Sequence, residues 1–349
     1  MKRLISIFIA ASVVLSATLM PVMPVAAQSS ASLSIVPKKN YTIEPGESVD
    51  DTLVIRNLDR DVPLELSLRV IDFTHDGDGG TPKLMLGEDA PTTTWSLKPY
   101  LTLPMNVTVD PSSSKTIDMN IAIPAGHGAG SYYSAIVYSS GASEGGNVGL
   151  SASGVTLVFT QIPGEVKQDL KLEKFGAYRQ ANGNTKEGYK FFNTTQPEMI
   201  AYTLKNSGNV TESPVGNITL RDMFGRTREI DNVNPNGSLA LIGQTRTYKA
   251  CIQLKEDEVD FNGRATTAKE CDTPGLWPGY YRASLDLFYG QNGNNTEEIN
   301  GSASFWYLPF WFLIVVILLL SVAGIYIWRM VNKFKGRKRG GRSIKSFRR

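Results

Sequence analysis

The sequence predicts an all-β fold, with two tandem immunoglobulin-like β-sandwich domains followed by a single transmembrane helix. Apolar and polar residues alternate with a period of two through most of the chain, and Gly, Pro and Asn turns separate these runs. Near the C-terminus a long apolar run precedes a basic tail. A period of two predicts half-buried strands, and short strands with frequent turns are typical of a β-sandwich.

The N-terminus has the pattern of a secretory signal peptide. Lys2 and Arg3 precede an apolar stretch that runs from residue 4 to residue 19. The small residues Val25-Ala26-Ala27 then form a site that a signal peptidase recognises. We therefore predict that residues 1–27 are the signal peptide and that the mature chain begins at Gln28.

Residues 28–163 are the predicted first domain. Two of its segments alternate clearly, and each is expected to be a strand with one face in the core. The apolar positions are Val62, Leu64, Leu66, Leu68 and Val70 in one segment and Ile117, Met119, Ile121 and Ile123 in the other.

Residues 164–304 are the predicted second domain, because the order of segments in the first domain recurs there. A strand that ends at Asn57 matches one that ends at Asn206, and the Ile117 strand matches residues 245–250. Two tandem sandwiches, joined near Pro163-Gly164, account for this order.

The firmest part of the repeat is a shared Gly and Tyr pair. Gly130-Ser131-Tyr132-Tyr133 in the first half matches Gly279-Tyr280-Tyr281 in the second. In each domain we expect the glycine to open a turn and one tyrosine ring to lie in the core. Its hydroxyl would then cap a loop.

Residues 305–328 are the predicted transmembrane helix, and residues 329–349 are a basic tail with ten Lys or Arg and no acid. About twenty apolar residues cover a hydrocarbon core of roughly 30 Å. Aromatic residues, which favour headgroup depth, occupy both ends of the run: Phe305, Trp306, Tyr307 and Trp311, then Tyr326 and Trp328. Because Lys and Arg beside a span stay cytoplasmic, we predict a single-pass protein of the cell membrane with its N-terminus outside.

The charge of the chain is divided at the same boundaries. Of its 36 Lys and Arg, 24 lie in the predicted exterior against all 33 acids, so the exterior carries a net charge of about −9. An acidic exterior argues against nucleic acid as a partner, since that role needs a basic surface. The span and the basic tail are predicted to contact membrane lipid.

Cys251 and Cys271 are the only cysteines, and both lie in the predicted exterior, where thiols oxidise. We predict one disulfide between them. Two buried free thiols are the alternative for an organism that forms few disulfides. Neither cysteine lies near His75 or His127 in the sequence, so a zinc site is not expected.

Motifs for catalysis are missing, and the sequence predicts no enzyme, no catalytic residue, no cofactor and no metal. Only two histidines exist, and no nucleophile elbow or phosphate loop is present. The acids Glu256, Asp257 and Glu258 are interpreted as a solvated face. Three further acids on a glycine-rich segment weakly resemble a calcium loop, and we interpret them as a polar hairpin. They are Asp72, Asp76 and Asp78.

Two further features concern binding. Trp95 and Trp277 are the tryptophans that precede the span; we expect Trp95 to pack in a core and Trp277 to lie on the surface. Asn-x-Ser/Thr triplets would suit a glycosylated eukaryotic receptor, although turn-rich β proteins generate such triplets by chance. They begin at Asn40, Asn106, Asn193, Asn209, Asn217, Asn236, Asn294 and Asn300.

The order of several segments resembles the WxL-interacting proteins of bacterial cell surfaces. The segments are Tyr41-Thr42-Ile43-Glu44-Pro45-Gly46, Trp95, Val107-Thr108-Val109-Asp110-Pro111 and Pro124 through Tyr133. The resemblance implies a first domain that binds peptidoglycan and a second that binds partner proteins. The cysteine pair is not part of the family's pattern, and no binding residue can be transferred.

We therefore predict a non-catalytic, membrane-anchored bacterial surface protein with sandwich ectodomains. It would bind cell-wall peptidoglycan or partner surface proteins through binding residues that the sequence does not identify. One alternative is a structural scaffold subunit of a cell-envelope complex. A second is a carboxylate-dependent hydrolase of wall glycan.

Overall fold

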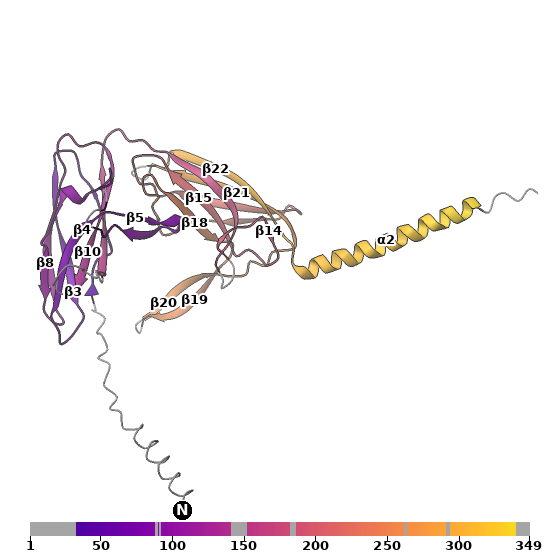
Figure 1. The fold of residues 1–349 in the computed structure, drawn as a ribbon, viewed down its shortest axis with the longest axis horizontal. Helices are drawn as coiled ribbons and strands as arrows, with labels where there is room; N and C mark the ends of the chain where they lie inside the picture. Colours follow the sequence, from indigo (N-terminus) through magenta and orange to yellow (C-terminus); the bar gives the residue numbers. More distant parts are fainter. Residues whose placement is uncertain are drawn as a thin grey trace, which may run out of the picture.

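The computed structural model describes residues 33–87, 90, 92–140, 152–181, 186–261, 264–290 and 294–339. The predicted signal peptide and the end of the basic tail lie outside this part of the chain. Figure 1 shows two bodies of β-structure and one long helix, α2 (Phe310–Arg339), that leaves the second body.

Domain 1 consists of two layered sheets and a projecting hairpin. One sheet has the strand order β1-β3-β9-β7, and the other has the order β2-β11-β10-β4-β8. The strands are β1 (Leu33–Ser34), β2 (Lys38–Thr42), β3 (Ser48–Asn57), β4 (Leu64–Ile71), β7 (Leu101–Thr102), β8 (Asn106–Val109), β9 (Ser114–Ala122), β10 (Gly130–Ser140) and β11 (Ala152–Ile162). The hairpin is β5 (Phe73–Asp76) with β6 (Thr81–Leu84), joined by a short 3-10 turn, η1 (Gly77–Gly79). A second such turn, η2 (Lys98–Tyr100), precedes β7.

Domain 2 also consists of two layered sheets and a hairpin. Its sheets have the orders β13-β12-β15-β18 and β14-β22-β21-β16-β17, and a separate hairpin pairs β19 with β20. The strands are β12 (Leu170–Arg179), β13 (Gly188–Tyr189), β14 (Phe192–Asn193), β15 (Met199–Asn206), β16 (Val215–Asp222), β17 (Thr227–Ile230), β18 (Thr245–Cys251), β19 (Leu254–Phe261), β20 (Arg264–Cys271), β21 (Gly279–Tyr289) and β22 (Glu297–Tyr307).

The five-stranded sheets of the two domains share one strand order, whereas the four-stranded sheets differ at one edge, where β7 lies beside β9 in domain 1 and β13 lies beside β12 in domain 2. In each, a short early strand runs parallel to the last strand, β2 beside β11 and β14 beside β22, while the other sheet-forming pairs are antiparallel. The predicted fold class is therefore confirmed as two immunoglobulin-like sandwiches followed by an apolar helix.

The strand alternation predicted from the sequence fills the core of domain 1. Leu64, Leu66 and Leu68 of β4 are all buried there. One position differs, because β4 begins at Leu64 and Val62 is 57% exposed in the preceding turn. The Asp59 carboxylate accepts a hydrogen bond from the Val62 amide, so this residue belongs to the turn.

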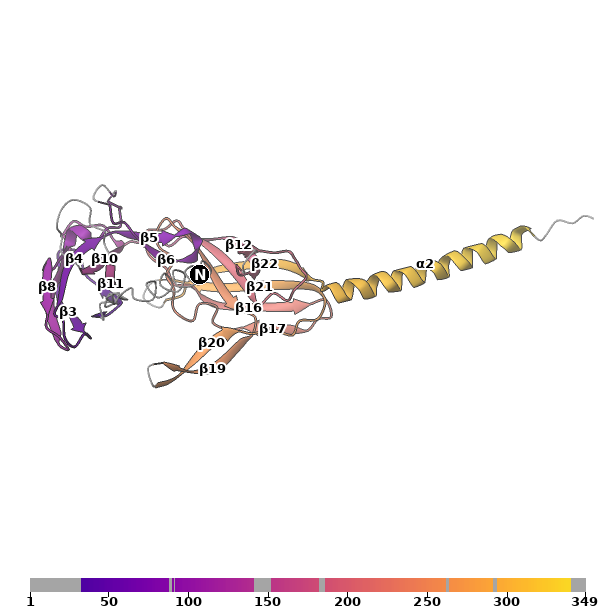
Figure 2. The same cartoon turned by 60° about the horizontal axis from the view of Figure 1, so that its bottom comes forward.

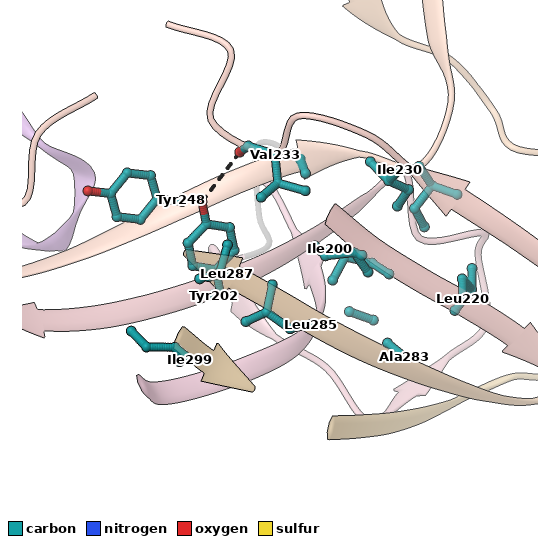
Figure 3. Close-up of a cluster of buried hydrophobic side chains, with 14 of the residues drawn as sticks. Ile200, Tyr202, Leu220, Ile230, Val233, Tyr248, Ala283, Leu285, Leu287 and Ile299 are labelled. Carbon is teal, nitrogen blue, oxygen red and sulfur yellow. Dashed lines mark hydrogen bonds between the residues drawn. The ribbon is translucent and has the colours of Figure 1, made fainter. Parts of the chain in front are cut away.

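The core of domain 2 is built around two tyrosines (Figure 3). The rings of Tyr202 and Tyr248 stack with their centroids 4.9 Å apart, and both side chains are buried. The Tyr202 hydroxyl donates to the carbonyl oxygen of Val233 at 3.5 Å, so its polar atom has a partner inside the apolar core.

A buried asparagine ends one strand of each domain at a matching place, Asn57 in β3 and Asn206 in β15. The Nδ2 of Asn57 donates to two loop carbonyl oxygens at 2.9 and 3.2 Å. The Nδ2 of Asn206 does the same at 2.7 and 2.9 Å, and both side chains are at most 1% exposed. Burial removes these carbonyl oxygens from water, and the side-chain amide of each asparagine supplies the hydrogen-bond donors that they need.

One tyrosine of each repeated pair makes a corner, in which its hydroxyl binds a backbone carbonyl oxygen of the preceding loop. The Tyr132 hydroxyl donates to the Gly128 carbonyl oxygen at 3.2 Å, and the Tyr281 hydroxyl donates to the Trp277 carbonyl oxygen at 2.7 Å. Each tyrosine follows its turn glycine by two residues, so Tyr132 is the counterpart of Tyr281. Tyr133 points to the opposite face of the sheet, because successive strand side chains alternate.

The helix begins later than the sequence predicts. Phe305, Trp306 and Tyr307, which we placed in the span, are the last residues of β22. The side chains of these residues alternate between the two faces of the sheet. Phe305 is buried and stacks on Tyr281, with the two ring centroids 5.2 Å apart. Residues Phe310–Phe334 contain an 18-residue stretch with a mean hydropathy of 2.8 and are long and apolar enough to cross a membrane.

Cys251 and Cys271 are joined by a disulfide, as we predicted from their position. The bond closes the base of the β19–β20 hairpin, which projects from the body of domain 2 in both views (Figure 2).

Replacing both cysteines, Cys251→Ser with Cys271→Ser, should lower the free energy of unfolding of domain 2. The disulfide closes a loop of 20 residues. Such a loop contributes about 3 kcal/mol on the chain-entropy model. Thermal unfolding of the full chain in detergent, followed by circular dichroism, measures the effect; an unchanged midpoint would contradict it.

Asn206→Ala should destabilise domain 2 by about 2–4 kcal/mol, because it removes two buried hydrogen bonds: the Val210 carbonyl oxygen loses its donor, and the Ala240 carbonyl oxygen keeps only the Glu212 amide. Asn300→Ala is the matched control in the same domain, since Asn300 is exposed and its amide donates only to Glu298. Urea unfolding compares the two variants. Equal midpoints for both would show that the asparagine corner does not stabilise the fold.

Candidate binding site

Domain 2 packs against the outer face of one sheet of domain 1. On β10, Tyr138 points into the domain 1 core, whereas Tyr133 and Val137 point outward. These outward residues form an apolar cluster with Phe73 of the β5–β6 hairpin and Leu241 of domain 2. The sheet is therefore buried on both faces where the domains meet.

Trp95 covers the edge of this cluster. Its ring stacks on that of Tyr133 at 6.2 Å, and Phe73 lies 5.1 Å from Tyr133 on another side. Trp95 thus packs against the apolar cluster between the two domains, and it lies outside the core of domain 1.

Asn209 of domain 2 forms a polar clamp, because it makes hydrogen bonds to domain 1 and to the linker, which is the segment between β11 and β12. The Asn209 carbonyl oxygen accepts from the Ser131 amide at 3.0 Å, and its Nδ2 donates to the Ala129 carbonyl oxygen at 3.1 Å. Its Oδ1 accepts from the amide of Lys167, in the linker, at 2.7 Å. Domains joined by a small polar interface move by default, but here apolar packing and directed hydrogen bonds act together and hold one arrangement.

The β5–β6 hairpin is a third contact, and Figure 1 shows it reaching from domain 1 to domain 2. The His75 amide donates to Oε1 of Gln244 at 2.7 Å. At the hairpin tip, Gly80 has a φ of +75°, which favours glycine, and a Cβ there would lie 2.4 Å from Nε of Arg246 and displace that side chain. This segment is the glycine-rich one that resembled a calcium loop. Across the described ranges, no group of three or more His, Cys, Asp or Glu could hold a metal ion.

Asp72, at the end of β4, anchors the loop that leads to Trp95. Its carboxylate is 6% exposed and accepts hydrogen bonds from Ser96 Oγ at 2.6 Å and Ser134 Oγ at 3.0 Å. The Thr93 amide donates to its other oxygen at 3.3 Å. A buried carboxylate needs such donors, so this loop is tied firmly to the sheet.

Beside Asp72 lies a pocket of about 180 Å³. Arg69 of β4 and Lys98 supply its cationic side chains, Thr92 adds a hydroxyl, and Ile71 and Met85 supply apolar surface. Neither Arg69 nor Lys98 forms an ion pair within the part of the chain that the structure describes. The pocket therefore presents two cations together with the Asp72 carboxylate, which also lines it and is engaged by the two serine hydroxyls.

Sequence reasoning left the binding residues unknown, and it missed this pocket. Arg69 was visible only as a polar position in an alternating strand, and Lys98 lies about thirty residues away. Trp277 is 63% exposed, in line with its expected surface position. The acids that suggested a solvated face lie on the projecting hairpin, where Glu256 pairs with Lys269 at 2.8 Å and Asp257 with Lys255 at 2.9 Å.

Comparison with known proteins gives a fold likeness only. No family model and no curated protein matches the chain. A solved chaperone–tip adhesin complex of CFA/I fimbriae has 10% identity and a TM-score of 0.36, covering 80% of this chain and 100% of that chain. The Escherichia coli chaperone DraB has 12% identity and a TM-score of 0.33, covering 78% of this chain and 96% of that chain. The resemblance to WxL-interacting proteins stays a prediction.

The junction should weaken in acid because of His75. Burial, with the nearby Arg246 charge adding to it, lowers the pKa of His75 from 6.5 to about 4. Between these values the unfolded chain binds the extra proton, so the stabilisation is complete above pH 6.5 and is lost as the pH falls towards 4. His75→Gln should flatten this dependence in thermal unfolding between pH 7 and pH 4.

The matched control changes the other histidine of the chain, in the variant His127→Gln. This variant should keep the acid-dependent loss of the wild-type chain. A His75→Gln variant that loses stability with the same slope would show that the junction does not respond to this side chain.

Proposed function

We propose that the chain is a non-catalytic, membrane-anchored bacterial surface protein that binds cell-wall material or a partner surface protein through its sandwich domains. The observation that supports this most is the pocket of domain 1, where the cationic side chains of Arg69 and Lys98 form no ion pair within the described residues. The span and the predicted signal peptide would place this pocket outside the cell.

The chemistry of the pocket fits a small carboxylate ligand. Arg offers a planar pair of donors that matches a carboxylate, and Lys98 adds a second positive charge. Ile71 and Met85 provide surface for a short apolar side chain. A volume of about 180 Å³ holds one or two small residues, so we propose the carboxylate end of a peptide stem of peptidoglycan as the ligand.

Hydrolysis of wall glycan is less well supported. A glycosidase needs two carboxylates that face each other across the bond to be cleaved. The clustered acids Glu256 and Asp257 are instead paired with lysines on an exposed hairpin. The Asp72 carboxylate is already engaged by serine hydroxyls.

A scaffold role in an envelope complex is the second candidate. It is favoured by the disulfide-closed β19–β20 hairpin, which forms a sheet of its own with no third strand in the described structure. Exposed strand edges of this kind can accept a strand from another protein.

Double substitution of the pocket, Arg69→Ala with Lys98→Ala, should weaken binding to purified cell walls by about tenfold or more, because each hydrogen bond to a charged group contributes about 1.5–3 kcal/mol. Co-sedimentation of the full chain in detergent with walls stripped of protein and accessory polymers measures this. The matched control is Arg56→Ala with Lys115→Ala, which removes an exposed Arg and Lys from the other sheet.

Equal loss in both double variants would mean that net charge, not the pocket, drives binding. A wild-type chain that fails to sediment with stripped walls but co-purifies stoichiometrically with other membrane proteins would contradict wall binding and favour the scaffold role.

A further inference from the structure

Three loops of domain 2 lie at the end of the sandwich from which the apolar helix leaves. The last strand ends at Tyr307, and α2 begins at Phe310. In the sheet, Tyr307 pairs with Gly279 at the start of β21, and Phe192 of β14 pairs with Trp306. Asp222, at the end of β16, pairs with Tyr281, so the β16–β17 turn belongs to the same end.

Each of these loops exposes large apolar side chains. They are Phe191 (49% exposed) and Phe192 (66%) before and in β14, Met223 (57%) and Phe224 (68%) in the β16–β17 turn, and Trp277 (63%) before β21. Single exposed apolar residues are common on soluble surfaces and need no explanation. Five from three separate loops at one end of a domain are a patch, which we call the helix-side patch.

The patch is held in place by specific contacts. The Tyr281 hydroxyl donates to the carbonyl oxygen of Trp277 at 2.7 Å. The Arg226 guanidinium lies over the rings of both Phe224 and Trp277, at 5.7 and 5.5 Å from their centroids, and pairs with Asp222 at 2.6 Å. The aromatic rings are therefore presented outward with little freedom left to lose on contact with a partner.

Charge sets this end apart from the rest of the exterior. Segments 190–193, 221–228 and 275–282 contain five Lys or Arg and one acid, Asp222. The predicted exterior as a whole carries a net charge of about −9. A basic, aromatic end on an acidic body fits a surface that is both anionic and partly apolar.

We propose that the helix-side patch lies in the headgroup region of the bilayer that α2 crosses, with Trp277 and Phe224 at the interface and the arginines near anionic phospholipid. This rests on the proposed membrane anchoring. The occupant is set by the chain itself, since only Leu308 and Pro309 separate β22 from the helix. Aromatic rings favour headgroup depth, and an anionic leaflet attracts basic residues that lie near its surface.

Methionine oxidation tests the proposal. Met105 in domain 1 and Met223 in the patch are 77% and 57% exposed in the structure, and the variant Val315→Met adds a methionine within the apolar part of α2. The full chain in vesicles of phosphatidylcholine and phosphatidylglycerol is treated with dilute hydrogen peroxide, and sulfoxide at each methionine is followed by mass spectrometry. Met223 should oxidise at least about threefold more slowly than Met105, and the introduced methionine at position 315 more slowly still.

The three rates separate the possible failures. Protection at position 315 with Met223 as reactive as Met105 would overturn the patch proposal and leave membrane anchoring intact. Equal oxidation of all three would mean that α2 does not enter the bilayer, and the anchoring itself would fail.

A second measurement identifies what touches the patch. The photo-reactive amino acid benzoylphenylalanine replaces Phe224, with Met105 as the negative position and Val315, within α2, as the positive one. Adducts of phosphatidylglycerol at positions 224 and 315 but not at 105 support the proposal. Adducts at 315 alone, or a protein adduct at 224 in native membranes, would overturn it.

Discussion

The junction between the two sandwiches is the constraint on which the rest of the structure depends. Leu241 of domain 2 closes an apolar cluster on the outer face of a domain 1 sheet, while Asn209 makes hydrogen bonds to both domain 1 and the linker. Neither the apolar cluster nor the hydrogen bonds of Asn209 would fix the arrangement of the domains alone, because a small polar contact permits rotation and an apolar contact lacks direction. Together they set the position of the pocket at Arg69 relative to the end of domain 2 from which the helix leaves.

The same constraint explains why matching strands of the two five-stranded sheets have different patterns of burial. β21 alternates between buried and more exposed positions, because only one of its faces is covered. β10, its counterpart in domain 1, is buried at nearly every position, because domain 2 covers its second face. The paired tyrosines show the division of roles: Tyr132 makes the loop corner that Tyr281 makes in domain 2, whereas Tyr133 packs at the junction.

The contrast between local features and contacts at the junction also shows what could be predicted from the sequence. Features that depend on local periodicity or on a repeated residue were accessible, including the strands, the two corners and the long apolar helix. The boundary at Phe305 was not, because a strand that alternates Phe, Trp and Tyr is as apolar as the helix that follows it. Partnership with β21, a long-range interaction, decides the state of these three residues. The pocket was inaccessible for a related reason, since Arg69 and Lys98 become neighbours only when the Asp72 carboxylate ties the intervening loop to the sheet.

Charge and rigidity together bear on how the proposed binding would work. If the basic, aromatic end of domain 2 rests on an anionic bilayer, the remaining acidic surface is repelled by that bilayer, and the repulsion is strongest within a Debye length of about 8–10 Å. Domain 1 is then held away from the lipid, and the clamped junction prevents it from folding back. A ligand at the pocket would meet a site whose distance from the membrane is already set, so little conformational entropy is lost on binding. A flexible stalk would search a larger volume but would lose that entropy with every ligand it bound.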